Sequence, residues 1–443
     1  MNKIKNIFLI SMDAIRPDYL NIFDNTKNTQ NTKNLKKILG NGVAFNNCII
    51  SNVGTPSSHV SMITGAYPFH TGVRNNFAQG MSDKVTTIQE ILSSNNWITS
   101  TFVNHKHLTH LNFDKGSNFF IFHPSVEGTG TDIHPCTDHF TPAEKTTDRV
   151  IHHYSFLNAL DEKQKKFFFI HYLDAHLDLG DMKNYKKNVL YVDEQIGRLY
   201  DHVEKQGELD ETLWVLTADH GEGQPGETRY ELTGGTGLEV FDTSIKCPLI
   251  FSWPGLSEKN VVYDDVQVRQ IDIVPTILSL VDLPINFNRI DGTALEYYMN
   301  LKNSENIPDT KFAYCETFSP GWFMKAWGTT NYELTFRVHD WVSVRYDNSW
   351  KVMYNADNNK LEPLEVYNLI DDPEERVNII DKVTGEYYIK LANAFILQTI
   401  PEKQNDVSQE VTQQMLVSAG KFSYEKNKHR TGMFVPKAEG GLL

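Results

Sequence analysis

Two segments of the sequence place acidic and imidazole side chains directly after apolar runs. Asp13 follows Ile7–Ile10, and Asp219 and His220 follow Leu213–Thr217. A carboxylate in such a position often only caps a helix or forms a turn. If both runs are parallel strands, however, their carboxyl ends lie at one edge of a sheet, and Asp13, Asp219 and His220 can converge on one cation. Two Asp and one His suit Mn²⁺, Zn²⁺ or Ca²⁺ better than a soft metal.

A third segment, SNVGTPSSHVSMITGAYPFHTGV, carries a hydroxyl that could act as a nucleophile. Val43–Ile50 predicts a strand, and Pro56 favours the first turn of a helix, so Thr55 falls at the predicted N-cap. Thr is a common cap, which gives this position an ordinary structural explanation. A helix N-terminus also stabilises an alkoxide and an anionic ester. Because a Thr hydroxyl is scarcely ionised at neutral pH, a divalent cation would be needed to make Thr55 reactive.

The candidate residues lie among elements with the pattern of an α/β fold. The predicted strands are Ile7–Ile10, Val43–Ile50, Ile98–Val103, Phe167–Tyr172 and Leu213–Thr217. The predicted helices between and after them are Thr86–Leu92, Thr147–Leu160, Leu190–Lys205 and Val274–Leu280. This alternation predicts a largely parallel sheet sandwiched by helices, with the functional site at the carboxyl ends of the strands.

A change of composition near residue 300 predicts a division into domains. Residues 1–300 form the predicted catalytic domain. Shorter strand signals such as Trp341–Tyr346 and Trp350–Tyr354 predict a smaller C-terminal α+β domain with an antiparallel sheet over residues 301–400. Residues 401–443 show no clear period and are predicted to be a tail.

The composition limits the partners and the compartment. With 40% hydrophobic residues, the 443-residue chain can bury a large core. A formal net charge of -14 argues against a general affinity for nucleic acid or anionic membranes. No stretch approaches the roughly 18 to 20 apolar residues of a membrane span, and the N-terminus lacks a signal cleavage site. Four dispersed cysteines without a CxxC pair, Cys48, Cys136, Cys247 and Cys315, favour the cytoplasm.

The segment around Thr55 resembles the nucleophile signature of the sulfatase family, which is part of the alkaline phosphatase superfamily. Counting back ten residues from Gly65 gives Thr55, the position of the family's nucleophile. Further blocks in the family's order are IRPDYL, TADHGEG, IKCPLIFSWPG, VRQIDIVPTILSLVDLP, RIDGTAL and EVYNLIDDPEERVNI. The resemblance implies an alkaline-phosphatase-like fold and an ester hydrolase acting on a small anionic ester. It also implies that the cation is held by Asp13, Thr55, Asp219 and His220.

The signature departs from the sulfatase pattern at the nucleophile. Sulfatases use Cys or Ser, converted to formylglycine, within a Cys-x-Pro-x-Arg core, whereas Thr55, Ser57 and His59 occupy the nucleophile, proline and arginine positions here. Oxidation of a Thr side chain would give a ketone, so the formylglycine route is closed. Thr is the nucleophile of related phosphodiesterases, which favours a phosphoester, phosphodiester or phosphonate monoester and a covalent Thr55 intermediate. The alternatives are a sulfuric ester hydrolase, a soluble phosphoryl transferase and a degenerate binding protein.

Three histidines complete the catalytic residues that the resemblance implies. FVNHKHLTH resembles the family's Lys-x-His-Leu element, which places His105 at the lysine and His107 at the histidine. On an extended segment this spacing points both rings the same way, and His is a suitable proton donor. FFFIHYLDAHLDLG resembles the block that supplies a catalytic histidine, here His176, as leaving-group acid or ligand of a substrate oxygen.

Other positions bear on the substrate and on the metal. Asn76 matches a family position that binds a substrate oxygen, although Asn is also common in turns, and Arg229 could add positive charge. Ala14 stands where many sulfatases have a second Asp, which argues for Mn²⁺ or Zn²⁺ over Ca²⁺, a cation that takes six to eight oxygen ligands. One cation is expected, and a second metal involving Asp174 stays open. The sequence carries no signal for an oligomeric state.

Overall fold

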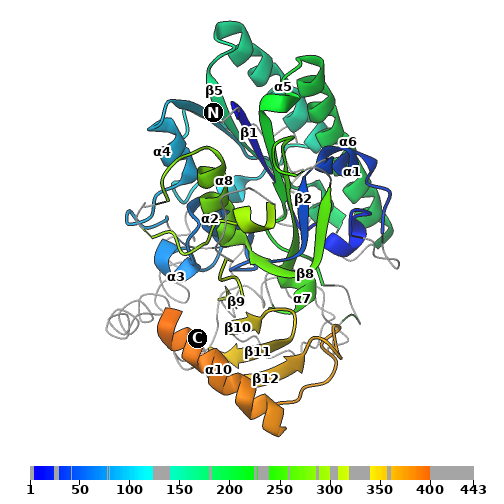
Figure 1. Ribbon diagram of the computed structural model, residues 1–443, viewed down its shortest axis with the longest axis vertical. Coiled ribbons are helices and arrows are strands. Elements are labelled where there is room, and N and C mark those ends of the chain that lie inside the picture. Colours follow the sequence, from blue (N-terminus) through cyan, green and yellow to red (C-terminus); the bar gives the residue numbers. More distant parts are fainter. Residues whose placement is uncertain are drawn as a thin grey trace, which may run out of the picture.

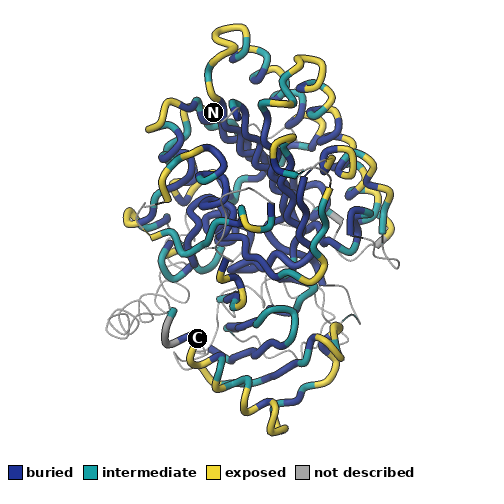
Figure 2. The backbone as a smooth tube through the Cα atoms, viewed as in Figure 1, coloured by how far each residue is buried: buried dark blue, intermediate teal, exposed yellow. Residues whose placement is uncertain are grey.

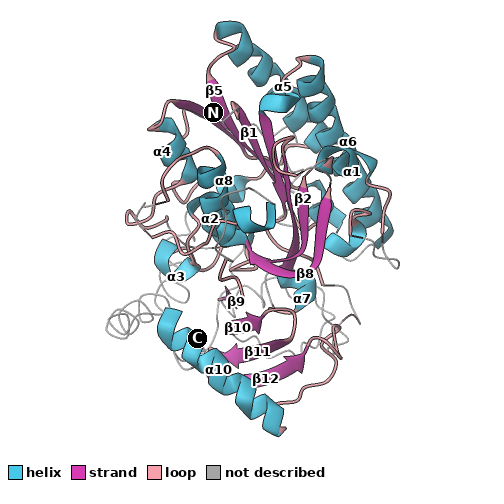
Figure 3. Cartoon of the chain, in the orientation of Figure 1, coloured by secondary structure: helices cyan, strands magenta, loops and turns pink. Residues whose placement is uncertain are grey.

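A large twisted sheet between layers of helices dominates the structure, and a smaller sheet lies below it with the last helix (Figures 1 and 3). The computed structural model describes residues 4–23, 29–40, 42–76, 78, 80–122, 140–178, 182–223, 227, 239–257, 260–285, 289–299, 308–318, 340–356 and 361–399. No helix within these ranges is both long and apolar enough to span a membrane.

The large sheet has eight strands in the order β4-β3-β5-β1-β6-β7-β2-β8. Strand β7 is antiparallel to both of its neighbours, and every other neighbouring pair is parallel. The strands are β1 (Asn6–Met12), β2 (Val43–Ile49), β3 (Trp97–Phe102), β4 (Phe119–Ile121), β5 (Lys165–Tyr172), β6 (Thr212–Thr217), β7 (Lys246–Ser252) and β8 (Val261–Arg269). The prediction of a largely parallel sheet is therefore confirmed.

Both faces of this sheet are covered by helices, and the middle of the molecule is buried (Figure 2). Every residue of β1 is buried, as expected for a central parallel strand. Its side chains alternate between two apolar clusters, with Phe8 in one and Leu9 in the other. Helices α1 (Lys33–Leu39), α5 (Ala143–Leu160) and α6 (Met182–Lys205) cover the first face. Helices α2 (Thr55–Thr64), α4 (Ile88–Ser93) and α8 (Ile273–Leu280) cover the second.

Short helices connect these elements. The α-helical ones are α3 (Pro68–Thr71) and α7 (Asp242–Ile245). The 3₁₀ helices are η1 (Pro17–Tyr19), η2 (Lys106–Leu108), η3 (Asp174–Asp178), η4 (Leu209–Glu211), η5 (Gln270–Asp272) and η6 (Glu296–Met299). Two of them, η2 and η3, begin shortly after strands β3 and β5 and carry histidines that the sequence had singled out.

The sequence missed three strands of the large sheet, β4, β7 and β8. Strand β7 contains Pro248 within an otherwise apolar run, and Pro is a signal against a central strand. Strand β8 lies at the sheet edge, where Asp264 and Asp265 are exposed and interrupt the apolar alternation. Strand β4 has only three residues, which is too short for a pattern.

The smaller sheet is antiparallel in the order β12-β11-β10-β9. Its strands are β9 (Phe312–Thr317), β10 (Trp341–Tyr346), β11 (Trp350–Asn355) and β12 (Glu362–Asn368), and helix α10 (Val383–Thr399) packs against it. The prediction of a smaller C-terminal α+β domain is confirmed, whereas the expected boundaries at 300 and 400 and the tail 401–443 lie outside the described residues. The Glu316 amide donates to Ser51 O over 3.1 Å, which holds β9 against the loop that leads to Thr55.

Candidate active site

The carboxyl ends of neighbouring strands β1 and β6 bring Asp13, Asp219 and His220 together. All three side chains are fully buried. The Nε2 atom of His220 lies 3.4 Å from Asp13 Oδ1 and 3.3 Å from Asp219 Oδ2. The two strand ends therefore bring Asp13 close to Asp219 and His220, although more than 200 residues of sequence separate them.

Thr55 joins this group from the start of α2. It is the first helical residue, and Gly54, with φ -86° and ψ 130°, is the N-cap, so the predicted N-cap position for Thr55 is off by one residue. Thr55 Oγ1 lies 3.1 Å from His220 Nε2. The other ring nitrogen, Nδ1, lies 3.0 Å from Gly221 O and must carry a hydrogen to make that bond. Nε2 is then left to accept the Thr55 hydroxyl hydrogen or to bind a cation.

The buried carboxylates of Asp13 and Asp219 lie close enough to interact electrostatically. Burial and the neighbouring Asp219 raise the pKa of Asp13 well above its usual range. Burial also acts to raise the pKa of Asp219, but the imidazoles around it, His220 first, outweigh this and lower the pKa to about 2. Asp13 Oδ1 and Asp219 Oδ2 are buried and accept no hydrogen bond from the described residues. Uncompensated acceptors of this kind are what a bound cation would satisfy.

His176 lies at the same place and completes a set of ligand atoms. It comes from η3, after β5, and its ring is 5.6 Å from that of His220. Ligand atoms of Asp13, His176 and His220 all lie within 4.8 Å of one another. Together with Asp219, they offer two imidazole nitrogens and two carboxylates. This donor set fits a divalent cation such as Zn²⁺ or Mn²⁺.

Two further buried histidines, His59 and His171, contact residues of the site. His59 Nδ1 donates to Thr55 O over 2.7 Å, and its Nε2 is 2.8 Å from Ser11 Oγ on β1. His171 Nε2 is 3.1 Å from Asp13 Oδ2, and its ring packs edge-on against His59 with centroids 4.8 Å apart. Burial lowers the pKa of His59 to about 3 and that of His171 to about 4.

Sequence reasoning did not assign roles to these two histidines. His59 stands at the family's arginine position, and His171 lies within the apolar run FFFIHYL that predicts a strand. The usable signal for His171 was a lone imidazole near the carboxyl end of a strand beside β1. Nothing in the sequence indicates that the His59 side chain contacts strand β1.

His105 and His107 face each other across a turn. The segment Lys106–Leu108 is a 3₁₀ helix, so the expectation of an extended segment is wrong, and the rings are perpendicular with centroids 4.3 Å apart. Burial comes first among the causes that lower the pKa of His105, which is 2% exposed and close enough to His171 and His176 to be affected by their charge. Burial also lowers the pKa of His107 to about 3.

The remaining predicted positions differ in how they relate to the site. Asn76 lies beside the N-cap, because a Cβ added to Gly54 would come within 2.3 Å of Asn76 Oδ1. This oxygen is buried and accepts no hydrogen bond from the described part of the chain. Asp174 Oδ1 accepts the Ala143 amide at the start of α5 over 3.1 Å, which is a structural role. Arg229 lies outside the described residues.

The sequence matches the family of enzymes that this site resembles. A model of the sulfatase family matches residues 5–283. The chain therefore belongs to the sulfatase family. Similar curated proteins include the N-acetylglucosamine-6-sulfatase of Bos taurus, 26% identical over 227 residues, which are 46% of this chain and 38% of that protein. The multifunctional alkaline phosphatase superfamily protein PehA of Trinickia caryophylli is 26% identical over 216 residues, which are 45% of this chain and 40% of that protein.

Solved structures of low sequence identity share the fold over nearly the whole chain. One is a phosphonate monoester hydrolase of Agrobacterium radiobacter, with a TM-score of 0.67 and 17% identity over 89% of this chain and 95% of that one. Another was solved with its substrate, D-glucosamine-2-N,6-O-disulfate, with a TM-score of 0.69 and 17% identity over 92% and 98% of the two chains. The alkaline-phosphatase-like fold class is thereby confirmed. In sequence, by contrast, the chain spans only about a third to two fifths of the length of the curated relatives.

Proposed function

We propose that the protein is a metal-dependent hydrolase that cleaves a phosphoester, phosphodiester or phosphonate monoester through a covalent Thr55 ester. One observation carries this proposal. The Thr55 hydroxyl lies at the N-terminus of α2, 3.1 Å from His220 Nε2 and beside two buried carboxylates, each with one oxygen that accepts no hydrogen bond from the described residues. A hydroxyl held in such a place is suited to nucleophilic attack.

Each residue of the site would have its own role in the reaction. Thr55 Oγ attacks phosphorus, its proton passes to solvent water, and the bond to the leaving alcohol breaks. His107 or His105 donates a proton to the leaving oxygen. Water then attacks phosphorus in the Thr55 ester and gives a proton to the histidine that had protonated the leaving alcohol, while the threonine oxygen leaves and takes a proton from solvent water. An anionic substrate raises the pKa of a neighbouring imidazole, which offsets the effect of burial on both histidines.

A divalent cation bound here would neutralise the carboxylates and stabilise the negative charge that develops on oxygen. We assign Asp13, Asp219 and His220 as its protein ligands, with Thr55 Oγ1 and His176 within reach. Two imidazoles and few carboxylates favour Zn²⁺ or Mn²⁺ over Ca²⁺, and Ala14 in place of a second Asp points the same way. For His176 the sequence predicts an acid or substrate ligand, and its position also allows metal binding.

His59 and His171 would act as positioning residues. His59 joins the first turn of α2 to Ser11 on β1, and His171 orients Asp13. The nucleophile and one metal ligand are thus tied to the same strand. In this interpretation, His59 replaces the arginine of the sulfatase core with a neutral residue.

A sulfuric ester hydrolase is the second candidate function. Family membership favours it, and the curated relatives named above include a sulfatase. Against it stands the nucleophile, because Thr55 cannot become formylglycine. We also keep the cytoplasm as the proposed compartment, on the basis of the dispersed cysteines, of which Cys48, Cys247 and Cys315 are buried free thiols.

A substrate panel on the purified protein tests the proposal. Bis-(p-nitrophenyl) phosphate, p-nitrophenyl phenylphosphonate, p-nitrophenyl phosphate and p-nitrophenyl sulfate are compared with Mn²⁺, Zn²⁺ or Ca²⁺ added to chelated protein. We expect a phosphorus ester to be cleaved fastest, with Mn²⁺ or Zn²⁺. Thr55→Ala should abolish turnover, and Thr55→Ser should retain part of it. Faster cleavage of the sulfate would replace the proposal by the second candidate, and full activity of Thr55→Ala would exclude the covalent step.

A further inference from the structure

A buried ion pair joins the C-terminal sheet to the segment that carries Asn76. Arg74 Nε donates to Glu316 Oε1 of β9 over 2.6 Å, and Arg74 Nη2 binds Glu316 Oε2. The Glu316 side chain is fully buried, and that of Arg74 is 13% exposed. The Tyr314 hydroxyl also donates to Glu316 Oε2, over 2.5 Å. Both carboxylate oxygens therefore have donors, and the opposite charges of the pair cancel.

The main chain of Arg74 is connected to the start of α2 through Asn52. Asn52 Nδ2 donates to Arg74 O over 3.0 Å, and the Gly54 amide donates to Asn52 Oδ1 over 2.8 Å. Asn52 is 1% exposed. Because Gly54 is the N-cap of α2 and directly precedes Thr55, one buried side chain ties the Arg74 segment to the residue before the proposed nucleophile.

Strand β9 also contacts the loop 51–54 through its main chain. The Glu316 amide donates to Ser51 O over 3.1 Å, and Asn52 and Glu316 form an isolated parallel bridge. Glu316 therefore holds the loop with its main chain and Arg74 with its side chain. A guanidinium near the site could itself bind an anionic substrate, but the forked contact with Glu316 neutralises Arg74 and fixes its orientation.

We propose that Glu316 and Arg74, acting through Asn52, are positioning residues that fix the Thr55 hydroxyl for attack. The inference rests on the proposed role of Thr55. A displacement of about 1 Å in a reacting group can lower a rate about 100-fold, so the nucleophile needs such support. The C-terminal sheet would then be required for turnover, although none of its described residues is among the candidate metal ligands.

Kinetics of two variants test this assignment, with the ester that the wild type cleaves fastest. Arg74→Met/Glu316→Gln removes both charges and leaves an amide oxygen for Tyr314, so no buried charge loses its partner and the melting temperature should stay near that of the wild type. Asn52→Ala removes no charge and covers the case in which the double variant does not fold. We expect kcat to fall at least about tenfold in both variants, and KM to change less than about threefold.

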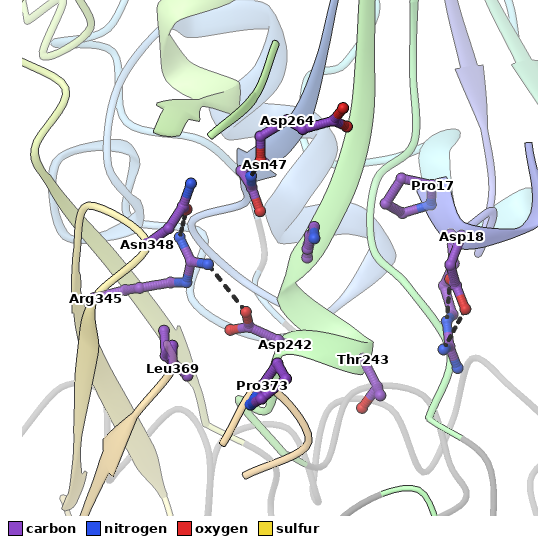
Figure 4. A pocket seen from close by; sticks show the side chains of 12 residues that line it. Pro17, Asp18, Asn47, Asp242, Thr243, Asp264, Arg345, Asn348, Leu369 and Pro373 are labelled. Carbon is purple, nitrogen blue, oxygen red and sulfur yellow. Dashed lines mark hydrogen bonds and ion pairs between the residues drawn. The ribbon is translucent and has the colours of Figure 1, made fainter. Parts of the chain in front are cut away.

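A second ion pair between the same two domains provides the matched control. Figure 4 shows Arg345 of β10, whose Nη2 donates to Asp242 Oδ2 of α7 over 3.1 Å. Neither Thr55 nor any candidate metal ligand is among the residues drawn there. Arg345→Met should lower the melting temperature but leave kcat and KM unchanged. An equal loss of kcat in Arg345→Met and the double variant would overturn the assignment, because any loosened domain contact would then have the same effect.

Hydrogen exchange at the Gly54 amide follows the loop without any need for turnover. We expect exchange at this amide to be at least about tenfold faster in Arg74→Met/Glu316→Gln than in the wild type, and unchanged in Arg345→Met. Wild-type kcat in the folded double variant or in Asn52→Ala, or unchanged Gly54 exchange in the double variant, would each overturn the assignment. If the wild type cleaves none of the esters, the proposed function fails, and exchange at Gly54 alone decides whether Glu316 and Arg74 hold the loop.

Discussion

Glu239 offers a sharp test of how the domain junction is held together. This residue is 9% exposed, and its Oε1 accepts no hydrogen bond from the described residues. Burial, followed by the charges of Glu222 and Glu375, raises its pKa from 4.5 to about 8, although Lys351 acts in the opposite direction. Ionisation of this carboxyl is therefore far less favourable in the folded protein than in the unfolded chain.

The sign of the pH effect follows from the raised pKa. Below about pH 4.5 the Glu239 carboxyl is protonated in both the folded and the unfolded protein, so its ionisation does not lower the free energy of unfolding. Between about pH 4.5 and 8 only the unfolded chain releases it, so stability falls as the pH rises. The shift corresponds to an upper limit on the order of 4 kcal/mol at pH 8. Glu375, whose pKa burial raises to about 7, adds a slope of the same sign.

Replacement of Glu239 by Gln should remove its share of this slope. We expect the stability of Glu239→Gln relative to the wild type to rise by roughly 1 to 4 kcal/mol between pH 5 and pH 8. Urea unfolding followed by circular dichroism at pH 5, 6, 7 and 8 measures the difference. Glu362→Gln, at an exposed position on β12, is the matched control. Its free energy of unfolding should change with pH in the same way as that of the wild type. If the free energy of unfolding of Glu239→Gln also followed the wild type at every pH, burial would not raise the pKa of Glu239 as described.

Three further results are expected. Gly54→Ala should lower kcat/KM, because the added Cβ would come within 2.3 Å of Asn76 Oδ1. If this clash is the cause, Gly54→Ala made in an Asn76→Ala background should lower kcat/KM little further. Lys351→Met should destabilise the protein by about 3 to 5 kcal/mol in urea, since it leaves the buried Glu375 without its cation and Asp242 with Arg345 alone. A loss below about 1 kcal/mol would contradict that. Chelation should lower the melting temperature of the wild type by an amount equivalent to about 3 kcal/mol for a cation held at 100-fold its Kd. Asp13→Ala should show no such response in the same thermal scans.

The strands that carry the candidate site were predictable because their signals are local. An apolar run that ends in a polar residue, as in Ile7–Ile10 before Asp13, predicts both the strand and its functional end. The antiparallel β7 and the edge strand β8 were missed because Pro248 and the exposed Asp264 break the usual patterns. Those features make sense only once the neighbouring strands are known.

The sequence by itself determined the α/β class and the chemical types at the site, because residue identity and strand periodicity are written in short segments. It also placed Thr55 at the start of a helix to within one residue. The tertiary structure alone decided which imidazoles surround the nucleophile, since contacts such as Thr55–His220 and His171–Asp13 join residues more than 150 positions apart. It alone showed that Lys351 of β11 pairs with Asp242 of α7. Pairing of this kind depends on how elements from both domains pack, and no single segment encodes it.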